Sequence, residues 1–167
     1  TVRTGYVARQ PLPCQGTSGI TRTNDTAGVD KTLLGIAAGA ASGTARGDQT
    51  SATSAYAQTK GRIARAEVGV NRSLVIEGVV GAANVRRDGA QLTKTSTGTR
   101  IASITLNGRT VRVPTAGNPV TVGQLATLSA PTVKRTQYGI SVVALHVDFL
   151  DSTVTLNLGI AKASIRP

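Results

Sequence analysis

The fold is decided by the stretch Gln137-Tyr-Gly-Ile-Ser-Val-Val-Ala-Leu-His-Val-Asp-Phe-Leu-Asp-Ser-Thr-Val-Thr-Leu-Asn-Leu-Gly-Ile-Ala-Lys-Ala-Ser-Ile165. It contains two long runs of mostly β-branched or small residues, joined by a short polar segment. Their alternation predicts a half-buried antiparallel hairpin and argues against a helix. Few of its side chains could take part in chemistry. We therefore expect a protein that acts through its shape and surface.

The remainder of the chain also indicates strands separated by turns. Asn107-Gly108 between two β-rich runs is the preferred two-residue hairpin turn. From Leu33 to Gly47, Gly and Ala alternate, which predicts a strand that another backbone approaches closely. The sequence therefore predicts an all-β fold, an antiparallel β-sandwich or barrel-like domain with an extended N-terminal arm. The other strand-like runs are Ser51–Val70, Leu74–Val85, Val120–Gly123 and Val133–Gln137.

Composition sets the domain organisation. The chain has 167 residues, 40% of them hydrophobic, but only 2% aromatic and no Trp or Met. One core of small aliphatic side chains is expected, in a single β domain over residues 31–167. Residues 1–30 are polar and contain Pro and Gly, which indicates an extended arm or linker. No apolar run approaches the length that crosses a bilayer.

The N-terminal region raises two further points. Without a Met, Thr1 is interpreted as a processed end, as cleavage of a secretory signal or simple Met trimming would leave. Cys14 is the one cysteine, so no internal disulfide can form. It is either an unpaired thiol in a loop or an intermolecular thiol that joins two subunits.

Positive charge is concentrated in the middle of the chain. The formal net charge is +11, and residues 86–135 carry eight Lys and Arg against Asp88 alone. These cations are either solvated strand residues that discourage wrong edge pairing, or contacts to a polyanion such as an anionic cell-wall polymer. The scarcity of aromatic residues makes nucleic acid an unlikely partner. The predicted basic patch consists of Arg86, Arg87, Lys94, Arg100, Arg109 and Arg112.

Catalytic chemistry has little support. His146 is the only imidazole, with Asp148 as its nearest candidate partner, and no Gly-x-Ser-x-Gly elbow is present. One His and one Cys do not make a zinc site. We therefore expect no enzyme, no metal and no cofactor.

Four segments carry a family resemblance. Thr97–Arg109, Gly117–Val120, Val142–Val147 and Leu158–Ala163 resemble the choice-of-anchor P proteins, secreted or surface proteins of actinobacteria. The similarity spans about Thr44 to Ile165. It implies a secreted, extracellular or cell-surface protein. Because the last residues, 164–167, carry no LPxTG-type sorting signal, it also implies retention through self-assembly or charge.

These features favour a secreted structural subunit that assembles with copies of itself into a filament or surface layer. The expected mechanism is strand donation, in which Thr1–Gln10 completes an open sheet of the next subunit. A monomeric adhesion module that binds a polyanion or carbohydrate is the main alternative, and an enzyme centred on His146 or a capsid-decoration protein are further ones. The predicted contact residues of the arm are Thr1, Val2, Thr4, Tyr6 and Ala8.

Overall fold

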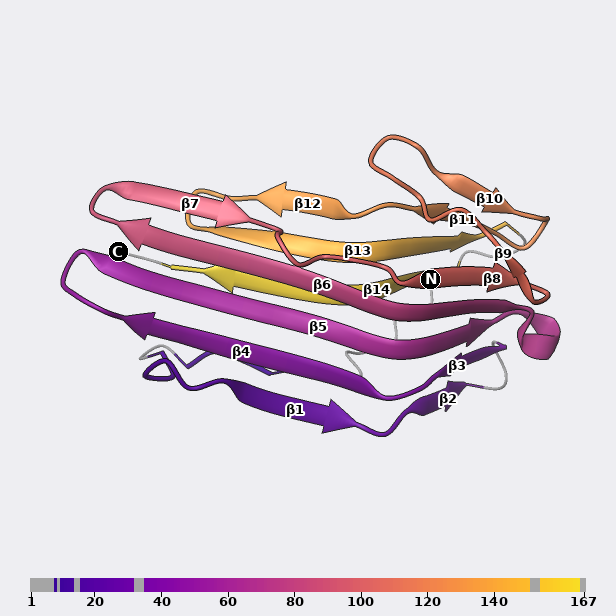
Figure 1. Ribbon diagram of the computed structural model, residues 1–167, viewed down its shortest axis with the longest axis horizontal. Helices are drawn as coiled ribbons and strands as arrows, with labels where there is room; N and C mark the ends of the chain where they lie inside the picture. Colours follow the sequence, from indigo (N-terminus) through magenta and orange to yellow (C-terminus); the bar gives the residue numbers. More distant parts are fainter. Residues whose placement is uncertain (1–7, 9, 14–15, 32–34, 151–153, 166–167) are drawn as a thin grey trace.

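The computed structural model describes residues 8, 10–13, 16–31, 35–150 and 154–165. The described chain folds into two antiparallel sheets that stack face to face, with the long strands running along the longest axis of the molecule (Figure 1). The two sheets stay separate layers, so the predicted all-β sandwich is confirmed and the barrel alternative is not. A single 3₁₀ turn in the described chain, η2 (Val70–Arg72), joins β5 to β6.

The larger sheet has β5 and β6 at its centre, two strands of 15 residues each. β4 and β3 share the other edge of β5, and β7 and β8 share the other edge of β6. Its nine strands are β1 (Arg22–Thr26), β2 (Val29–Lys31), β3 (Ile36–Ala38), β4 (Ala41–Gln49), β5 (Ser54–Val68), β6 (Leu74–Asp88), β7 (Gln91–Thr95), β8 (Ser103–Leu106) and β9 (Arg109–Thr110).

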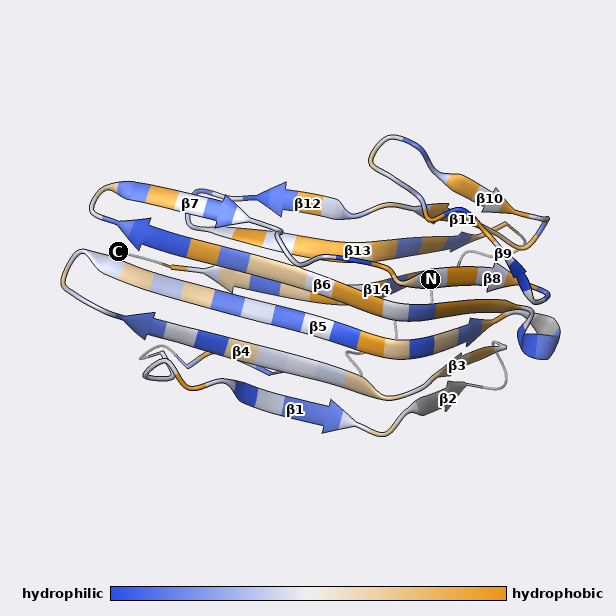
Figure 2. Ribbon diagram, viewed as in Figure 1, coloured by the Kyte–Doolittle hydropathy of each residue, from blue (hydrophilic) through white to orange (hydrophobic). Residues whose placement is uncertain are grey.

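The smaller sheet is built on the predicted C-terminal hairpin. β13 pairs with β14 along one edge, and with β11 and β12 in succession along the other. Its apolar residues produce the mostly hydrophobic band along the first part of β13, whereas β1 is almost wholly hydrophilic (Figure 2). The five strands are β10 (Val120–Val122), β11 (Ala126–Ser129), β12 (Thr132–Arg135), β13 (Gly139–Phe149) and β14 (Thr155–Ser164).

The two sheets touch backbone to backbone at three glycines. A Cβ added to Gly61 or Gly81 would overlap the carbonyl oxygen of Ile160 or of Gly159, respectively. Conversely, a Cβ on Gly159 would stand 2.8 Å from the amide nitrogen of Gly81. We call Gly61, Gly81 and Gly159 the glycine contact. Only residues without a side chain allow sheets to approach this closely, since stacked sheets usually lie about 10 Å apart.

The glycine contact separates two halves in which opposite sets of residues face the core. Gly78 in β6 and Gly159 in β14 have φ of +61° and +64°, and the strand register skips a residue pair at each. The pairing resumes in the same register beyond each glycine, but the inward and outward faces of the strand are exchanged there. In β6, for example, Leu74 and Ile76 face the core before Gly78, but Ala83 and Val85 face it afterwards.

The cores of the two halves differ in composition. We call the first the aliphatic half, because its buried cluster includes Leu74, Ile76, Ile104, Leu128 and Leu145. The second, the small-residue half, is built on a cluster of small and β-branched side chains. That cluster consists of Ala57, Ala83, Val85, Ile140, Val142, Ala161 and Ala163.

The predicted arm boundary at residue 30 is wrong. β1 pairs along its whole length with β4, and β2 pairs with β3, so the sheet already begins at Arg22. Four of the five residues of β1 are exposed. An edge strand solvated on both faces has no hydrophobic alternation, which is why the pattern of residues 22–26 gave no sign of a strand.

Candidate functional site

The described part of the N-terminal arm lies on the inner face of the larger sheet. We call residues 8 and 10–13 the arm segment. It passes over β4, where a Cβ on Gly43 would stand 3.1 Å from the carbonyl oxygen of Ala8 and 3.2 Å from the amide nitrogen of Gln10. Further along, a Cβ on Gly47 would stand 2.9 Å from Leu12 Cδ2. Gly43 and Gly47, with Ala45 between them on the same face of β4, thus form the floor on which the arm segment rests, as the Gly/Ala alternation predicted.

The arm segment and β14 occupy the same layer. Gly43, Gly61 and Gly81 are cross-strand partners, so they share one face of the sheet. β14 covers Gly61 and Gly81, while the arm segment covers Gly43. Leu12 also packs against the cluster that contains Ala161 and Ala163 of β14. The arm segment therefore lies beside the unpaired edge of β14, in the position that another strand of the smaller sheet would occupy.

β14 is the edge strand on this side of the smaller sheet. Its ladder partner is β13, and no other strand of the described chain is hydrogen-bonded to it. Thr59 Oγ1 donates to the carbonyl oxygen of Lys162 at 2.9 Å, which satisfies one acceptor. An edge strand of this kind is where strand addition takes place.

Thr17 anchors the segment that leads from the arm into β1. Its hydroxyl donates to the Gly47 carbonyl oxygen at 3.1 Å and accepts from the Gly47 amide at 3.2 Å. The Thr17 amide donates to the same carbonyl at 2.7 Å. Thr17 is the buried polar residue of the described core, at 6% exposure. These hydrogen bonds therefore attach the segment between the arm and β1 to β4 at Thr17.

Of the predicted arm residues, Ala8 lies over Gly43, half-buried. The remaining calls on the N-terminal region lie outside the described residues; they concern Thr1, Val2, Thr4, Tyr6 and Cys14.

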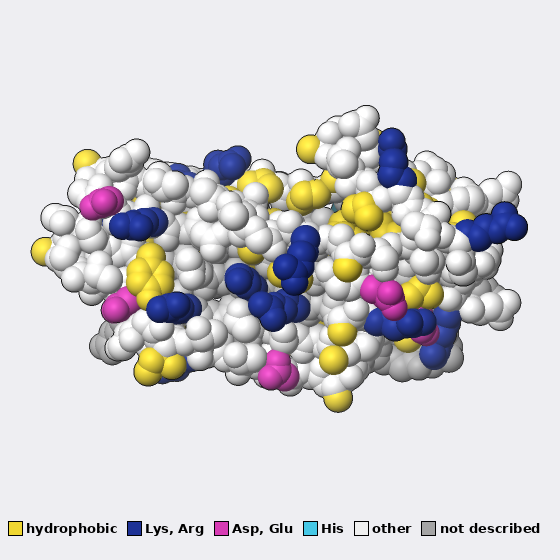
Figure 3. Space-filling model, in the orientation of Figure 1, with side chains coloured by type: hydrophobic (Ala, Val, Ile, Leu, Met, Phe, Trp, Pro, Cys, Tyr) yellow, Lys and Arg dark blue, Asp and Glu magenta, His cyan; other side chains and the backbone are white. Residues whose placement is uncertain are grey.

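The opposite, solvent-facing side of the larger sheet gathers positive charge. Every second residue of β5 from Tyr56 to Arg62 faces outward, and the cross-strand partners of these residues extend each into a row. Arg86 lies in the row of Tyr56 and Arg46 in the row of Gln58. We define the outer basic face as Arg46, Lys60, Arg62, Arg86 and Arg100, and Figure 3 shows Lys and Arg side chains spread over this side of the sheet.

The cations of the outer basic face have no carboxylate partner among the described residues. None of the five takes part in an ion pair within 4.0 Å, although Asp25 and Asp48 lie at the margin of the same rows. Arg46 instead stands over the ring of Tyr56, 5.6 Å from its centroid. Further along the sheet the charges are neutralised, because Arg65 contacts Glu67 at 2.8 Å and Glu77 at 3.0 Å.

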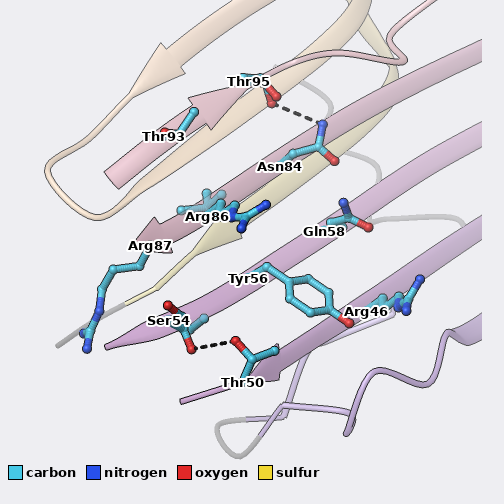
Figure 4. Close-up of a pocket in the computed structure, with 12 residues that line it drawn as sticks. Arg46, Thr50, Ser54, Tyr56, Gln58, Asn84, Arg86, Arg87, Thr93 and Thr95 are labelled. Carbon is cyan, nitrogen blue, oxygen red and sulfur yellow. Dashed lines mark hydrogen bonds between the residues drawn. The ribbon is translucent and has the colours of Figure 1, made fainter. Parts of the chain in front are cut away.

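A shallow hollow of about 570 Å³ lies at one end of the outer basic face. Tyr56 lies between Arg46 and Arg86 in it, and Gln58 and Asn84 line the next row (Figure 4). The side-chain amide of Gln58 makes no hydrogen bond to any described residue, whereas Asn84 Nδ2 donates to the Thr97 carbonyl oxygen at 3.0 Å. The hydroxyl side chains around it are Thr50, Ser54, Thr93 and Thr95.

The structure does not bring the predicted basic patch together. Arg86 and Arg100 belong to the outer basic face, but Arg87 donates to the Ala52 carbonyl at 3.0 Å, and Lys94 binds the Thr136 and Gln137 carbonyls. Arg109 and Arg112 lie on and after β9, at the opposite end of the molecule from β7 (Figure 1). β7 pairs with the end of β6 and β8 with its beginning, so the chain between them crosses the length of the sheet and separates these cations in space. Arg46, Lys60 and Arg62 were missed, and only the pairing of β4 with β5 reveals them.

His146 and Asp148 do meet, on the outer side of β13. His146 Nε2 lies 2.9 Å from Asp148 Oδ1, and Nδ1 lies 2.5 Å from Asn157 Oδ1. Ser129 is the cross-strand neighbour of His146, yet no hydroxyl of the described chain hydrogen-bonds the imidazole. Both ring nitrogens are already engaged, so the arrangement lacks the nucleophile–base pair that covalent catalysis requires.

No family model, curated protein or solved structure matches this chain. Within the described ranges, no cluster of three or more His, Cys, Asp or Glu side chains is placed to hold a metal ion. The described part of the chain likewise contains no helix with the length and apolar character that a membrane crossing requires.

Proposed function

We propose that the protein is an extracellular structural subunit that assembles with copies of itself by exchanging its N-terminal arm. One observation carries the proposal: the arm segment lies on a glycine floor, in the layer of β14 and beside its edge. A segment that fills this place in its own subunit can fill the same place in another subunit through identical contacts, which is the physical basis of domain swapping.

The packing of the small-residue half supports exchange. Leu12 of the arm and Leu92 of β7 pack, partly buried, against a cluster whose buried side chains are all Ala, Val or Ile. Thr17 is bonded to Gly47 and the sheet begins at Arg22, so the arm can leave without unpairing β1. Donation from each subunit to the next is a head-to-tail contact, and such contacts propagate into a filament unless the rotation closes a ring.

Two variants test the exchange. Deletion of residues 1–10 removes most of the arm, and Gly43→Val blocks its seat, because even one Cβ there approaches Ala8 and Gln10 closely. Both variants are expected to remain folded and to sediment as monomers, whereas the full chain of 17.0 kDa is expected to form filaments or layers in negative-stain micrographs. Ser42→Val is the matched control, since Ser42 is on the same strand but pairs with Arg62 on the opposite face. Normal polymers from the truncated chain would refute the proposal.

The monomeric alternative is distinguished by the full chain alone. A monodisperse 17.0 kDa species at every concentration would favour a monomeric binding module over a polymer. The resemblance to choice-of-anchor P proteins supports the extracellular setting of the proposal, and secretion can be checked by locating the native protein in culture medium, cell wall and cytoplasm.

A further inference from the structure

The outer basic face has a regular spacing. Its cations occupy four successive cross-strand rows of the larger sheet, those of Tyr56, Gln58, Lys60 and Arg62. Arg100 reaches the last row through its bridge to Val80. Neighbouring rows are two residues apart, or about 7 Å, so the rows span about 20 Å along the strands. Four of these cations are exposed, Lys60 is half-buried, and none has a carboxylate partner among the described residues. Such a ladder of cations is complementary to a linear molecule that carries negative charges at intervals.

The uncharged side chains between the cations indicate which class of anionic ligand the face could bind. Hydroxyl and amide groups, among them the unbonded amide of Gln58, line the hollow at one end of the ladder. These groups both donate and accept hydrogen bonds, as sugar hydroxyl groups do. Arg46 and Arg86 supply planar guanidinium groups that bind a carboxylate with two hydrogen bonds, and Tyr56 gives an apolar ring between them.

Nucleic acid fits this surface less well. Sequence-tolerant binding of single strands requires several aromatic side chains on which successive bases stack. Among the described residues, Tyr56 is the one aromatic side chain that lines the hollow, and Arg46 already stands over its ring. A chain of sugars requires no such series of stacking platforms.

We infer that the outer basic face binds an extended acidic polysaccharide, a glycan with carboxylate groups recurring along its chain. The site lies on the opposite side of the larger sheet from the arm segment, so it does not depend on arm exchange and would operate in a monomer or in a polymer. In this arrangement Lys60 and Arg62 hold the middle of the glycan, and the hollow around Tyr56 and Gln58 accommodates one of its sugars.

The test measures fluorescence anisotropy of a labelled oligogalacturonate, long enough to span the four rows, on titration with the full chain at low salt. We expect saturable binding that weakens with salt, and no binding of a maltooligosaccharide of equal length. K60Q/R62Q should weaken binding about tenfold, since each exposed charge contact contributes modestly. R109Q/R112Q removes the same charge from the far end of the molecule, so its affinity should change less than about twofold.

Three outcomes would overturn the inference. An equal loss of affinity for the oligogalacturonate in K60Q/R62Q and R109Q/R112Q would mean that net charge alone attracts the probe. Tighter binding of an oligothymidylate with the same number of charges would mean a nucleic-acid surface. An unchanged affinity in Gln58→Leu would mean that no sugar occupies the hollow, because this variant keeps every charge and removes only the amide. Glycan binding can be measured on monomer or on polymer. A negative binding result therefore leaves the arm-exchange proposal untouched, and the reverse also holds.

Discussion

The two halves of the sandwich differ in core, in cover and in surface charge. The aliphatic half is closed by Leu and Ile side chains of its own sheets, and Arg65 on its outer side is neutralised by Glu67 and Glu77. The small-residue half has a core of Ala, Val and Ile, admits the arm segment, and carries Arg46, Lys60 and Arg86 of the outer basic face. One half is self-sufficient, whereas the other presents the surfaces that could meet a partner. The comparison teaches that the stable core and the surfaces for partners lie at opposite ends of the same strands, and not in separate domains.

The glycine contact joins the halves, so Gly81→Val should produce the largest effect. A side chain there meets the backbone of Gly159 and not the movable end of another side chain, so the sheets must separate. We expect the free energy of unfolding to fall by about 4 kcal/mol or more, or the chain to fail to fold. Chemical denaturation measures the loss, with Thr44→Val on the outer side of β4 as the control for placing Val in a strand. An unchanged unfolding midpoint would show that the sheets do not touch at Gly81.

Truncations in the two cores sharpen the comparison. Leu145 and Val142 are both fully buried on β13, one in each half. Leu145→Ala should cost about 3 kcal/mol, because it removes more apolar volume from a core closed on all sides. Val142→Ala should cost about 1.5 kcal/mol, since fewer atoms are lost and the arm-covered half can relax. Denaturant titrations of both variants test this, and a larger cost for Val142→Ala would reverse the assignment of the stable half.

The arm's contribution to the small-residue half is expected to be smaller. Leu12 is half-buried, so Leu12→Ala should cost about 1 kcal/mol. A double-mutant cycle tests this contact directly. Gly47→Ala places a methyl group against Leu12 Cδ2 and should therefore lower stability. Leu12→Ala removes the atom that is hit, so the double variant should be more stable than the sum of the two single effects predicts. Part of the strain remains, because the new methyl also stands 3.0 Å from the Tyr56 carbonyl oxygen. Strict additivity of the two changes would place the arm elsewhere in solution.

The sequence predicts the local elements of this fold well. The C-terminal hairpin is β13 and β14, and Asn107-Gly108 is the turn between β8 and β9. The Gly/Ala run, predicted as one strand, forms two, β3 and β4, and β4 lies beneath another backbone. These features follow from turn chemistry and side-chain size, which act between near neighbours. Which face of the long strands points inward is not predictable in this way, because the faces exchange at Gly78 and Gly159, where φ is positive and one residue pair is missing from the ladder.

The candidate sites were predicted less well, for a related reason. The basic patch was sought among cations close in sequence, but Arg46, Lys60 and Arg62 are brought beside Arg86 by the register of β4, β5 and β6. That register is set by pairings across many residues. Only after the strands are aligned does a row of charges appear.

The smallest expected effect concerns the outer sides of the two halves. Lys60 has no acidic partner among the described residues and lies among other cations, so Lys60→Gln should raise stability by about 0.3 kcal/mol at low salt. Arg65→Gln removes the same charge but breaks contacts to Glu67 and Glu77, so it should lower stability by about 0.5 kcal/mol. Both changes should shrink toward zero at about 1 M ionic strength, where the screening length is about 3 Å. Thermal unfolding of both variants at low and high salt measures the signs. The same sign for both would mean that the two outer sides do not differ electrostatically, and the contrast between the halves would then be confined to their cores.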